Sequence, residues 1–304
     1  MFNIGLIIFK DKNMAINTSD VAKLRVQTGA GMMDCKNALE EANGDMEKAN
    51  EILRKKGIVK AAKRAGKIAA EGIVNVKSQG NRAVILEVNS ETDFVAKNED
   101  FQKVMVELTE CALVNSGASL EEILKSQIAG QSVEDYLVSA TAKAGEKIDL
   151  RRLSVLEKTD SDCFGAYIHM GGKIGVLVLL AGSTDENLAR DIAMHAAAAN
   201  PRYLDSASVP AEVVEKEKEI YTEQLKTEGK PANIMENILK GKLNKFYEEV
   251  CLVDQPYIKD DKKKIRELLP AGSQLKAYVR FELGEGLEKQ SKDFATEVAE
   301  QMGK

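Results

Sequence analysis

Two segments in the middle of the chain repeat one pattern of hydrophobic and polar positions. In the first, residues 72–76 turn at 79–81 into the apolar run 83–88, and a helical pattern begins near Glu99. The second repeats this order between residues 165 and 196. Each segment is typical of a β-hairpin covered by a helix, so we predict an α+β protein with two related core subdomains on small antiparallel sheets.

Two further strand patterns flank the second segment. Residues 150–156 and 274–281 carry them, and we expect both to complete the second sheet. The intervening residues 205–250 differ, because they form two highly charged helical patterns with thin apolar seams, joined at residues 229–231. Such narrow seams predict a helical hairpin that projects from the core.

Helical patterns occupy both ends of the chain. Residues 18–57 show three short helices, the first capped by Thr18 or Ser19 and the third ending before Gly57. The apolar positions of the first helix, expected in its core, are Val21, Leu24 and Val26. An amphipathic helix is predicted over residues 287–302.

These patterns predict seven parts. In chain order they are a leader (1–13), a three-helix, UBA-like docking domain (14–57), a basic linker helix (58–70), core subdomain 1 (71–148), core subdomain 2 (149–204 and 251–286), an inserted helical hairpin (205–250) and a C-terminal helical module (287–304). The leader holds an apolar run that is short for a signal peptide and lacks a basic flank and a cleavage site. We interpret it as an appended or mis-started segment ahead of Met14.

The composition is that of a soluble cytoplasmic protein. Of the 304 residues, 44% are hydrophobic and 30% charged, and no run is long enough to span a membrane. The net charge of −5 gives no general attraction to nucleic acid. The four cysteines are scattered without Cys-x-x-Cys spacing, so we expect free thiols in a reducing cytosol and neither a zinc site nor a disulfide framework.

Candidate chemistry is sparse along the whole chain. His195 lies in a helical stretch and is expected to be packed or hydrogen-bonded, whereas His169 sits at a hairpin turn and is expected to be exposed. Neither has a metal-type partner at usable spacing, and no phosphate-binding loop follows a strand. We therefore predict no catalytic residue, metal or cofactor, and a binding protein rather than an enzyme. The alternative is a small-molecule enzyme that uses His169 as a base.

A basic stretch between residues 55 and 67 has two interpretations. Six lysine and arginine side chains are interleaved there with alanine and glycine, a pattern that could track phosphates and would make the chain an RNA-binding protein. No aromatic residues are interleaved with them, which favours a solvated linker helix and no direct contact with nucleic acid.

One aromatic residue follows the apolar run 83–88. Phe94 stands between Asp93 and Val95, just after the polar residues that end the strand. A residue of this kind either folds back onto its own core or is presented by a rigid scaffold as an anchor for a partner. The pattern alone favours burial, because most aromatic residues in globular chains are buried, but it leaves both alternatives open.

Three stretches resemble the signatures of one protein family, bacterial elongation factor Ts. They are LRVQTGAGMMDCK over residues 24–36, TDFVAK over residues 92–97 and RFELGEG over residues 280–286. The resemblance extends from Met14 to Met302, and the leader departs from it.

The resemblance implies a guanine-nucleotide exchange factor for elongation factor Tu that embraces this GTPase. Thr92, Asp93, Phe94 and Val95 match the family's magnesium-dislocating element. The residues matching those that dock on the partner are Arg25, Met32 and Met33 for its GTPase domain, and His169 for another domain. Residues 205–250 match a segment used for homodimerisation in some members.

Overall fold

The structure, a computed structural model, describes residues 16–115 and 117–287. The predicted leader and C-terminal helix lie outside the described residues. The chain divides into two compact units, of which the first holds residues 16–67 together with Asp135–Ile148 and the second holds Ile68–Glu134 together with the chain from Asp149 onward. The smaller unit thus also contains a segment that follows the first predicted hairpin-plus-helix.

The first unit contains helices α1 (Thr18–Thr28), α2 (Met32–Glu41) and α3 (Met46–Arg64), and most of α7 (Val133–Ala144). Three of these helices share a small core, whose buried members are Val21, Leu24, Cys35, Ala38, Leu39, Ala42 and Ala49. The N-cap of α1 is Asn17, whose side chain accepts a hydrogen bond from the amide of Ser19 at 2.9 Å. Capping by Thr18 or Ser19 was therefore a wrong prediction, by one residue.

Helix α3 does not end before Gly57, as the sequence pattern predicted, but continues to Arg64. A glycine within a helix costs about 1 kcal/mol relative to alanine, which tertiary packing can offset. The packing here is close, because a Cβ atom at Gly57 would lie 3.2 Å from the Cβ of Ala142 in α7. Gly57 therefore marks an approach of α7 to α3 and not a helix end.

The second unit is built on two three-stranded antiparallel sheets. The first has the order β1-β2-β5, and the second has the order β10-β7-β6. The strands are β1 (Glu71–Gln79), β2 (Arg82–Ser90), β5 (Asp149–Glu157), β6 (Cys163–His169), β7 (Ile174–Ala181) and β10 (Gln274–Glu282). Both predicted hairpins and the predicted α+β class are confirmed.

The strand over residues 150–156 was assigned to the wrong sheet. As β5 it pairs with β2 in the first sheet, whereas β10 joins the second sheet as expected. The physical reason is that β2 is buried from Ala83 to Ser90 and needs a partner along both edges. Pairing with β5 satisfies the second edge of β2.

Strand β5 also supplies the charges that a buried acid requires. The Glu87 side chain has no exposed surface, and its carboxylate accepts hydrogen bonds from Arg151 at 2.9 Å and Arg152 at 2.6 Å. The amides of Asn89 and Gly284 complete the shell, at 3.1 and 2.9 Å. Burial alone would raise the pKa of Glu87, but these hydrogen bonds outweigh it and lower the pKa below its ordinary value.

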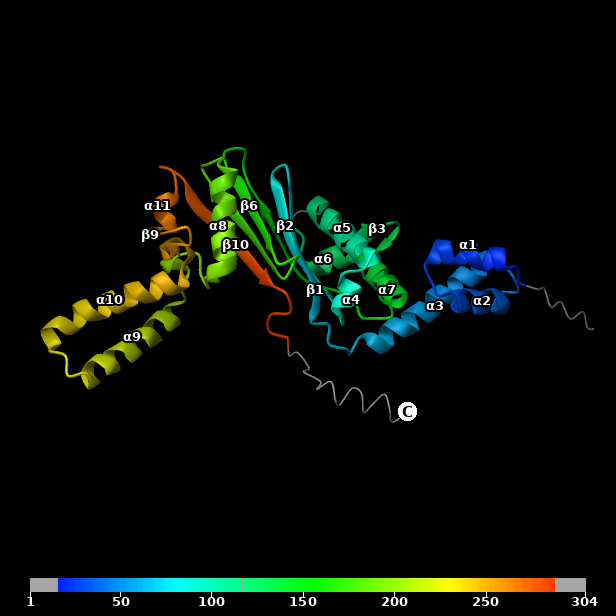
Figure 1. Cartoon of the computed structure of the whole chain (residues 1–304), viewed down its shortest axis with the longest axis horizontal. Helices are drawn as coiled ribbons and strands as arrows, with labels where there is room; N and C mark the ends of the chain where they lie inside the picture. The colour runs from blue at the N-terminus through cyan, green and yellow to red at the C-terminus, as the bar shows by residue number, and fades with distance from the viewer. Residues whose placement is uncertain (1–15, 116, 288–304) are drawn as a thin grey trace, which may run out of the picture. The chain divides into compact units, whose positions relative to one another are not determined.

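The two sheets pack face to face between two helices, as Figure 1 shows. Their shared core holds Val74 and Ile85 from the first sheet and Leu177 and Leu179 from the second. Helix α5 (Glu99–Val114) packs against β1 and β2, and α8 (Glu186–Ala199) against β6 and β7. A Cβ atom at Gly165 would lie 2.0 Å from the carbonyl oxygen of Ala189 in α8, so this helix rests directly on the strand.

Short elements connect these layers. They are α4 (Asp93–Ala96), α6 (Leu120–Lys125), β3 (Gln127–Ile128), β4 (Gln131–Ser132), η1 (Ser206–Ser208), η2 (Leu252–Asp254), β8 (Pro256–Tyr257), β9 (Asp260–Lys264) and α11 (Ile265–Leu268). The inserted helical hairpin is present as α9 (Ala211–Thr227) and α10 (Ala232–Val250), which lie side by side in Figure 1. Phe246, Val250 and Val209 pack together where the hairpin joins the rest of the unit.

His195 lies on the buried face of α8, as its helical surroundings predicted. It is 2% exposed, and its Nδ1 accepts a hydrogen bond from the amide of Ile258 at 3.2 Å. The other ring nitrogen, Nε2, must then donate to the Gln255 Oε1 atom at 3.0 Å. The ring is therefore neutral, and burial lowers its pKa below the ordinary value.

We expect this burial to make the protein less stable in mild acid. The unfolded chain takes up a proton at His195 near pH 6.5, whereas the folded chain does so only at lower pH. The free energy of unfolding should therefore fall as the pH drops from about 7 to 5. Urea unfolding across this range should show a smaller fall for His195→Gln than for the wild-type chain, with the exposed-site variant His169→Gln as control. Parallel curves for the wild-type chain and His195→Gln would contradict the expectation.

Candidate partner-binding site

The segment from Thr92 to Val95 forms a short, firmly held turn between β2 and α5. Thr92 has extended backbone angles, φ −125° and ψ 156°, and its hydroxyl accepts a hydrogen bond from the amide of Val95 at 3.4 Å. The buried Ser90 donates its hydroxyl to the Thr92 carbonyl at 2.8 Å. At the other end, Asn98 caps α5 by accepting from the amide of Asp100 at 2.9 Å. The backbone of α4 is thus fixed at both ends.

Phe94 stands out from this turn into solvent. Its side chain is 81% exposed, whereas the neighbouring Ala96 is 4% exposed. The alternative in which Phe94 folds back onto its own core is therefore wrong. An exposed aromatic on a rigid scaffold is the kind of residue that anchors protein–protein interfaces.

A pair of opposite charges borders the aromatic. Asp93 and Lys97, one helical turn apart, form an ion pair of 2.6 Å, with both side chains largely exposed. The hydrogen bond from Lys97 lowers the pKa of Asp93, so its carboxylate is ionised at neutral pH. The turn therefore presents an apolar ring beside charged groups that water or a partner can reach.

The turn that carries His169 is tied to the first sheet and to the chain beyond β10. The amide of Val74 donates to the carbonyl of Gly172 at 2.8 Å, and the Lys173 ammonium pairs with Glu71 at 2.6 Å. The amide of Leu283 donates to the carbonyl of Lys173 at 2.8 Å. His169 and Phe94 therefore belong to one compact unit, and His169 is exposed as its position in the sequence predicted.

The other predicted docking residues lie in the first unit, around the turn between α1 and α2. Gly29 ends α1 in the left-handed conformation, with φ 68°, which L-residues adopt at a cost. Just past this turn Met32 and Met33 are 51% and 62% exposed, and Arg25 on the last turn of α1 is also exposed. The structure thus places Arg25, Met32 and Met33 on a solvent-accessible surface.

Val26 was expected in the core but is 86% exposed beside these residues. The helical spacing indicates that Val26 is exposed, because Val21 and Leu24 are three positions apart and share a face. Val26 is two positions beyond Leu24, which rotates it about 200° around the helix axis. It is an apolar surface residue next to Arg25 that sequence reasoning missed.

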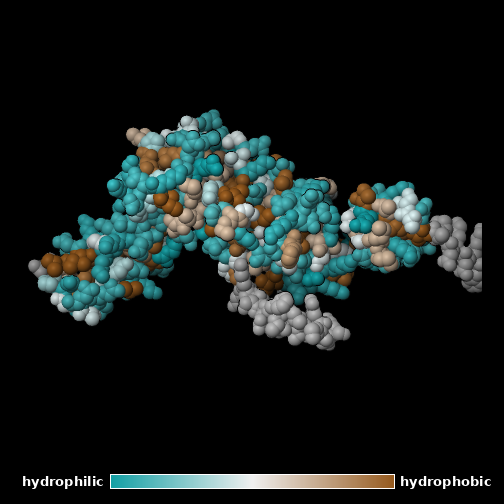
Figure 2. All heavy atoms as spheres, in the orientation of Figure 1, coloured by the Kyte–Doolittle hydropathy of each residue, from teal (hydrophilic) through white to brown (hydrophobic). Residues whose placement is uncertain are grey.

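Figure 2 shows how the exposed apolar side chains are distributed over one face of the molecule. On the face shown in Figure 2, the hydrophobic areas are small and separated by hydrophilic surface. Among the described residues, none of the helices has both the length and the apolar character needed to cross a membrane. On this face the exposed apolar residues therefore form no broad hydrophobic surface.

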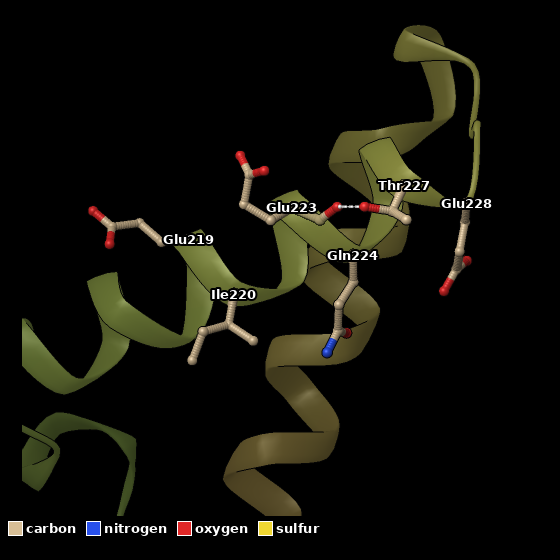
Figure 3. A pocket seen from close by; sticks show the side chains of 6 residues that line it. All are labelled: Glu219, Ile220, Glu223, Gln224, Thr227 and Glu228. Atoms are coloured by element: carbon tan, nitrogen blue, oxygen red, sulfur yellow. Dashed lines mark hydrogen bonds between the residues drawn. The ribbon is translucent and has the colours of Figure 1, made fainter.

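The rest of the described chain offers little catalytic chemistry. The part that the structure describes contains no group of three or more His, Cys, Asp or Glu side chains that could hold a metal ion. The groove in Figure 3 runs along α9 and is lined by Glu219, Ile220, Glu223, Gln224, Thr227 and Glu228. It brings together glutamates and an isoleucine but neither a histidine nor a cysteine. The four cysteines are buried free thiols.

The comparison with known families decides the identity. The family model described as Elongation factor TS matches residues 91–285, which is more than half of the chain. The chain belongs to the elongation factor Ts family. The match begins one residue before the Thr92–Val95 turn and includes His169 and most of the 280–286 stretch. Members of this family are translation elongation factors that act as nucleotide exchange factors for elongation factor Tu.

Proposed function

We propose that this chain releases GDP from elongation factor Tu by inserting Phe94 into the GTPase. The observation that carries the proposal is the 81% exposure of an aromatic ring on a turn whose backbone is fixed at both ends. A fixed backbone means that little conformational freedom is lost when the ring enters a partner. Most of its contact energy is then available to deform the GTPase.

The deformation that this insertion needs is small. GTPases hold GDP through backbone donors around the phosphates and through Mg²⁺, both of which depend on precise loop positions. A ring wedged between elements next to that site can shift the metal ligands without touching the nucleotide base. By linkage, the exchange factor and the nucleotide must weaken each other's binding by the same factor.

The remaining predicted residues are proposed to dock the factor. Arg25, Met32 and Met33 would contact the GTPase domain, where the flexible thioether side chains can adapt to an irregular surface. His169 would contact a second domain of elongation factor Tu. No bond is made or broken on this chain in the proposal, which therefore describes a cytoplasmic binding protein without its own cofactor. Residues 205–250 remain a candidate homodimer contact.

RNA binding through the 55–67 stretch is the weaker candidate. Lys56 is paired with Glu41 at 2.7 Å, and Lys60 is paired with Asp34 at 2.8 Å. These carboxylates offset part of the positive charge that a phosphate backbone would need. RNA binding that is tight, salt-dependent and independent of elongation factor Tu would favour this candidate instead.

The Mg²⁺ dependence of nucleotide release tests the proposed mechanism. If the factor acts by displacing Mg²⁺, it should accelerate the release of fluorescent GDP from elongation factor Tu strongly at millimolar Mg²⁺. The acceleration should shrink by about tenfold or more, equivalent to ~1.4 kcal/mol, once the metal is chelated. An acceleration of the same size with and without Mg²⁺ would show that the metal is not what the factor disturbs.

A further inference from the structure

Tyr167 and His169 lie two residues apart on the edge strand β6 and therefore on one face of the second sheet. The Tyr167 hydroxyl is 3.1 Å from Nδ1 of His169, within hydrogen-bond distance. Their rings are stacked, with centroids 5.9 Å apart and planes inclined by 26°. The exposed imidazole is thus held by a specific neighbour.

Tyr167 is itself well anchored. It packs at the margin of the core under α8, with Val176 and Ile192 among the buried residues of that core. Val176 is its cross-strand neighbour on β7. The backbone of His169 is fixed too, because its carbonyl accepts from the amides of Gly172 at 3.2 Å and Lys173 at 3.1 Å. A half-buried phenol therefore restrains a solvent-exposed imidazole.

We propose that Tyr167 is a positioning residue that sets the tautomer and orientation of His169 for binding elongation factor Tu. The Tyr167 hydroxyl donates to Nδ1, so the neutral ring carries its proton on Nε2. His169 then presents an oriented N–H donor suited to a carbonyl or carboxylate oxygen of the GTPase. This inference rests on the proposed docking role of His169.

The free protein tests the tautomer without any partner. At about pH 8, ¹⁵N NMR of the full chain should show His169 protonated on Nε2, with Nδ1 as an acceptor. In Tyr167→Phe, which removes only the hydroxyl, the Nδ1 resonance should move because its hydrogen bond is lost. A wild-type ring protonated on Nδ1, or an unchanged spectrum in the variant, would overturn the proposal.

Exchange kinetics test the consequence for binding. Tyr167→Phe should raise the concentration needed for half-maximal GDP release by about three- to tenfold, as expected for weakening one hydrogen bond. In a His169→Ala background the same change should have no further effect, because the ring that it positions is gone. Tyr278→Phe is the matched control, since its hydroxyl lies in the same sheet but donates to the carbonyl of Pro201.

Two kinetic outcomes would contradict the inference. One is that Tyr167→Phe raises the concentration needed for half-maximal GDP release equally in the wild-type chain and in the His169→Ala background. This would mean that Tyr167 does not act through His169. The other is normal exchange by His169→Ala, which would remove the docking role itself. If Phe94→Ala still slows release in that case, the wedge proposal survives and only the inference about His169 and Tyr167 fails.

Discussion

Phe94→Ala should slow GDP release from elongation factor Tu by one to two orders of magnitude. Truncating an interface anchor costs about 2 kcal/mol or more, and about 1.4 kcal/mol corresponds to a factor of ten. The stability of the factor itself should barely change, because an 81% exposed ring contributes little buried surface. Stopped-flow release of fluorescent GDP and thermal melting of the same variant measure the two effects separately.

Val114→Ala is the matched control for this change. Val114 is 75% exposed in the same unit, but it stands at the far end of α5 from the Phe94 turn. It should leave both melting and exchange unchanged. Asp93→Ala should slow exchange less than Phe94→Ala, because it removes a charge beside the ring and little contact area. A large fall in melting temperature with normal exchange would mean that Phe94 acts in folding and not as a wedge.

Glu87→Ala should destabilise the second unit by about 3–5 kcal/mol, the cost of removing one partner from a buried ion pair. The change leaves Arg151 and Arg152 side by side without the carboxylate that joins them. It also removes the acceptor for the amide of Gly284, and so loosens the chain just after β10. Urea unfolding of the full chain, followed by circular dichroism, measures the loss.

Glu157→Ala is the control for the Glu87 prediction. Glu157 pairs with Arg82 across the same two strands at 3.4 Å, but both side chains are about half exposed. Its removal should cost no more than about 1 kcal/mol. Similar losses of unfolding free energy from the two variants would show that the buried cluster contributes no more than a surface ion pair.

Because the pKa of Glu87 is lowered, the contribution of Glu87 to the free energy of unfolding should also disappear as the pH falls below about 4.3 and through the folded-state pKa.

Local patterns predicted most elements of the fold, because each is determined by nearby residues. The two hairpins follow from turn residues within a few positions of each strand end. The placement of β5 depends on a partner more than 60 residues earlier in the chain, which no local pattern contains. Glu87 within the apolar run 83–88 was the available signal, since a buried acid needs cations and β5 carries the adjacent arginines Arg151 and Arg152.

The candidate site was predicted from family resemblance more than from physical pattern. The pattern alone favoured burial of an aromatic after a strand, and only the structure shows that Phe94 is exposed. The Tyr167–His169 pair was missed, although alternate residues of a strand share a face and two ring side chains at that spacing can meet. Val26 lies about 200° around α1 from Leu24, so the helical spacing places it away from the buried face formed by Val21 and Leu24.

The most direct test of the central claim is the release of labelled GDP from elongation factor Tu at increasing concentrations of the full chain. We expect the release rate to rise with concentration and then to saturate, while the chain alone binds neither GDP nor GTP at micromolar levels. A release rate that the chain leaves unchanged, or nucleotide binding by the chain itself, would contradict the account.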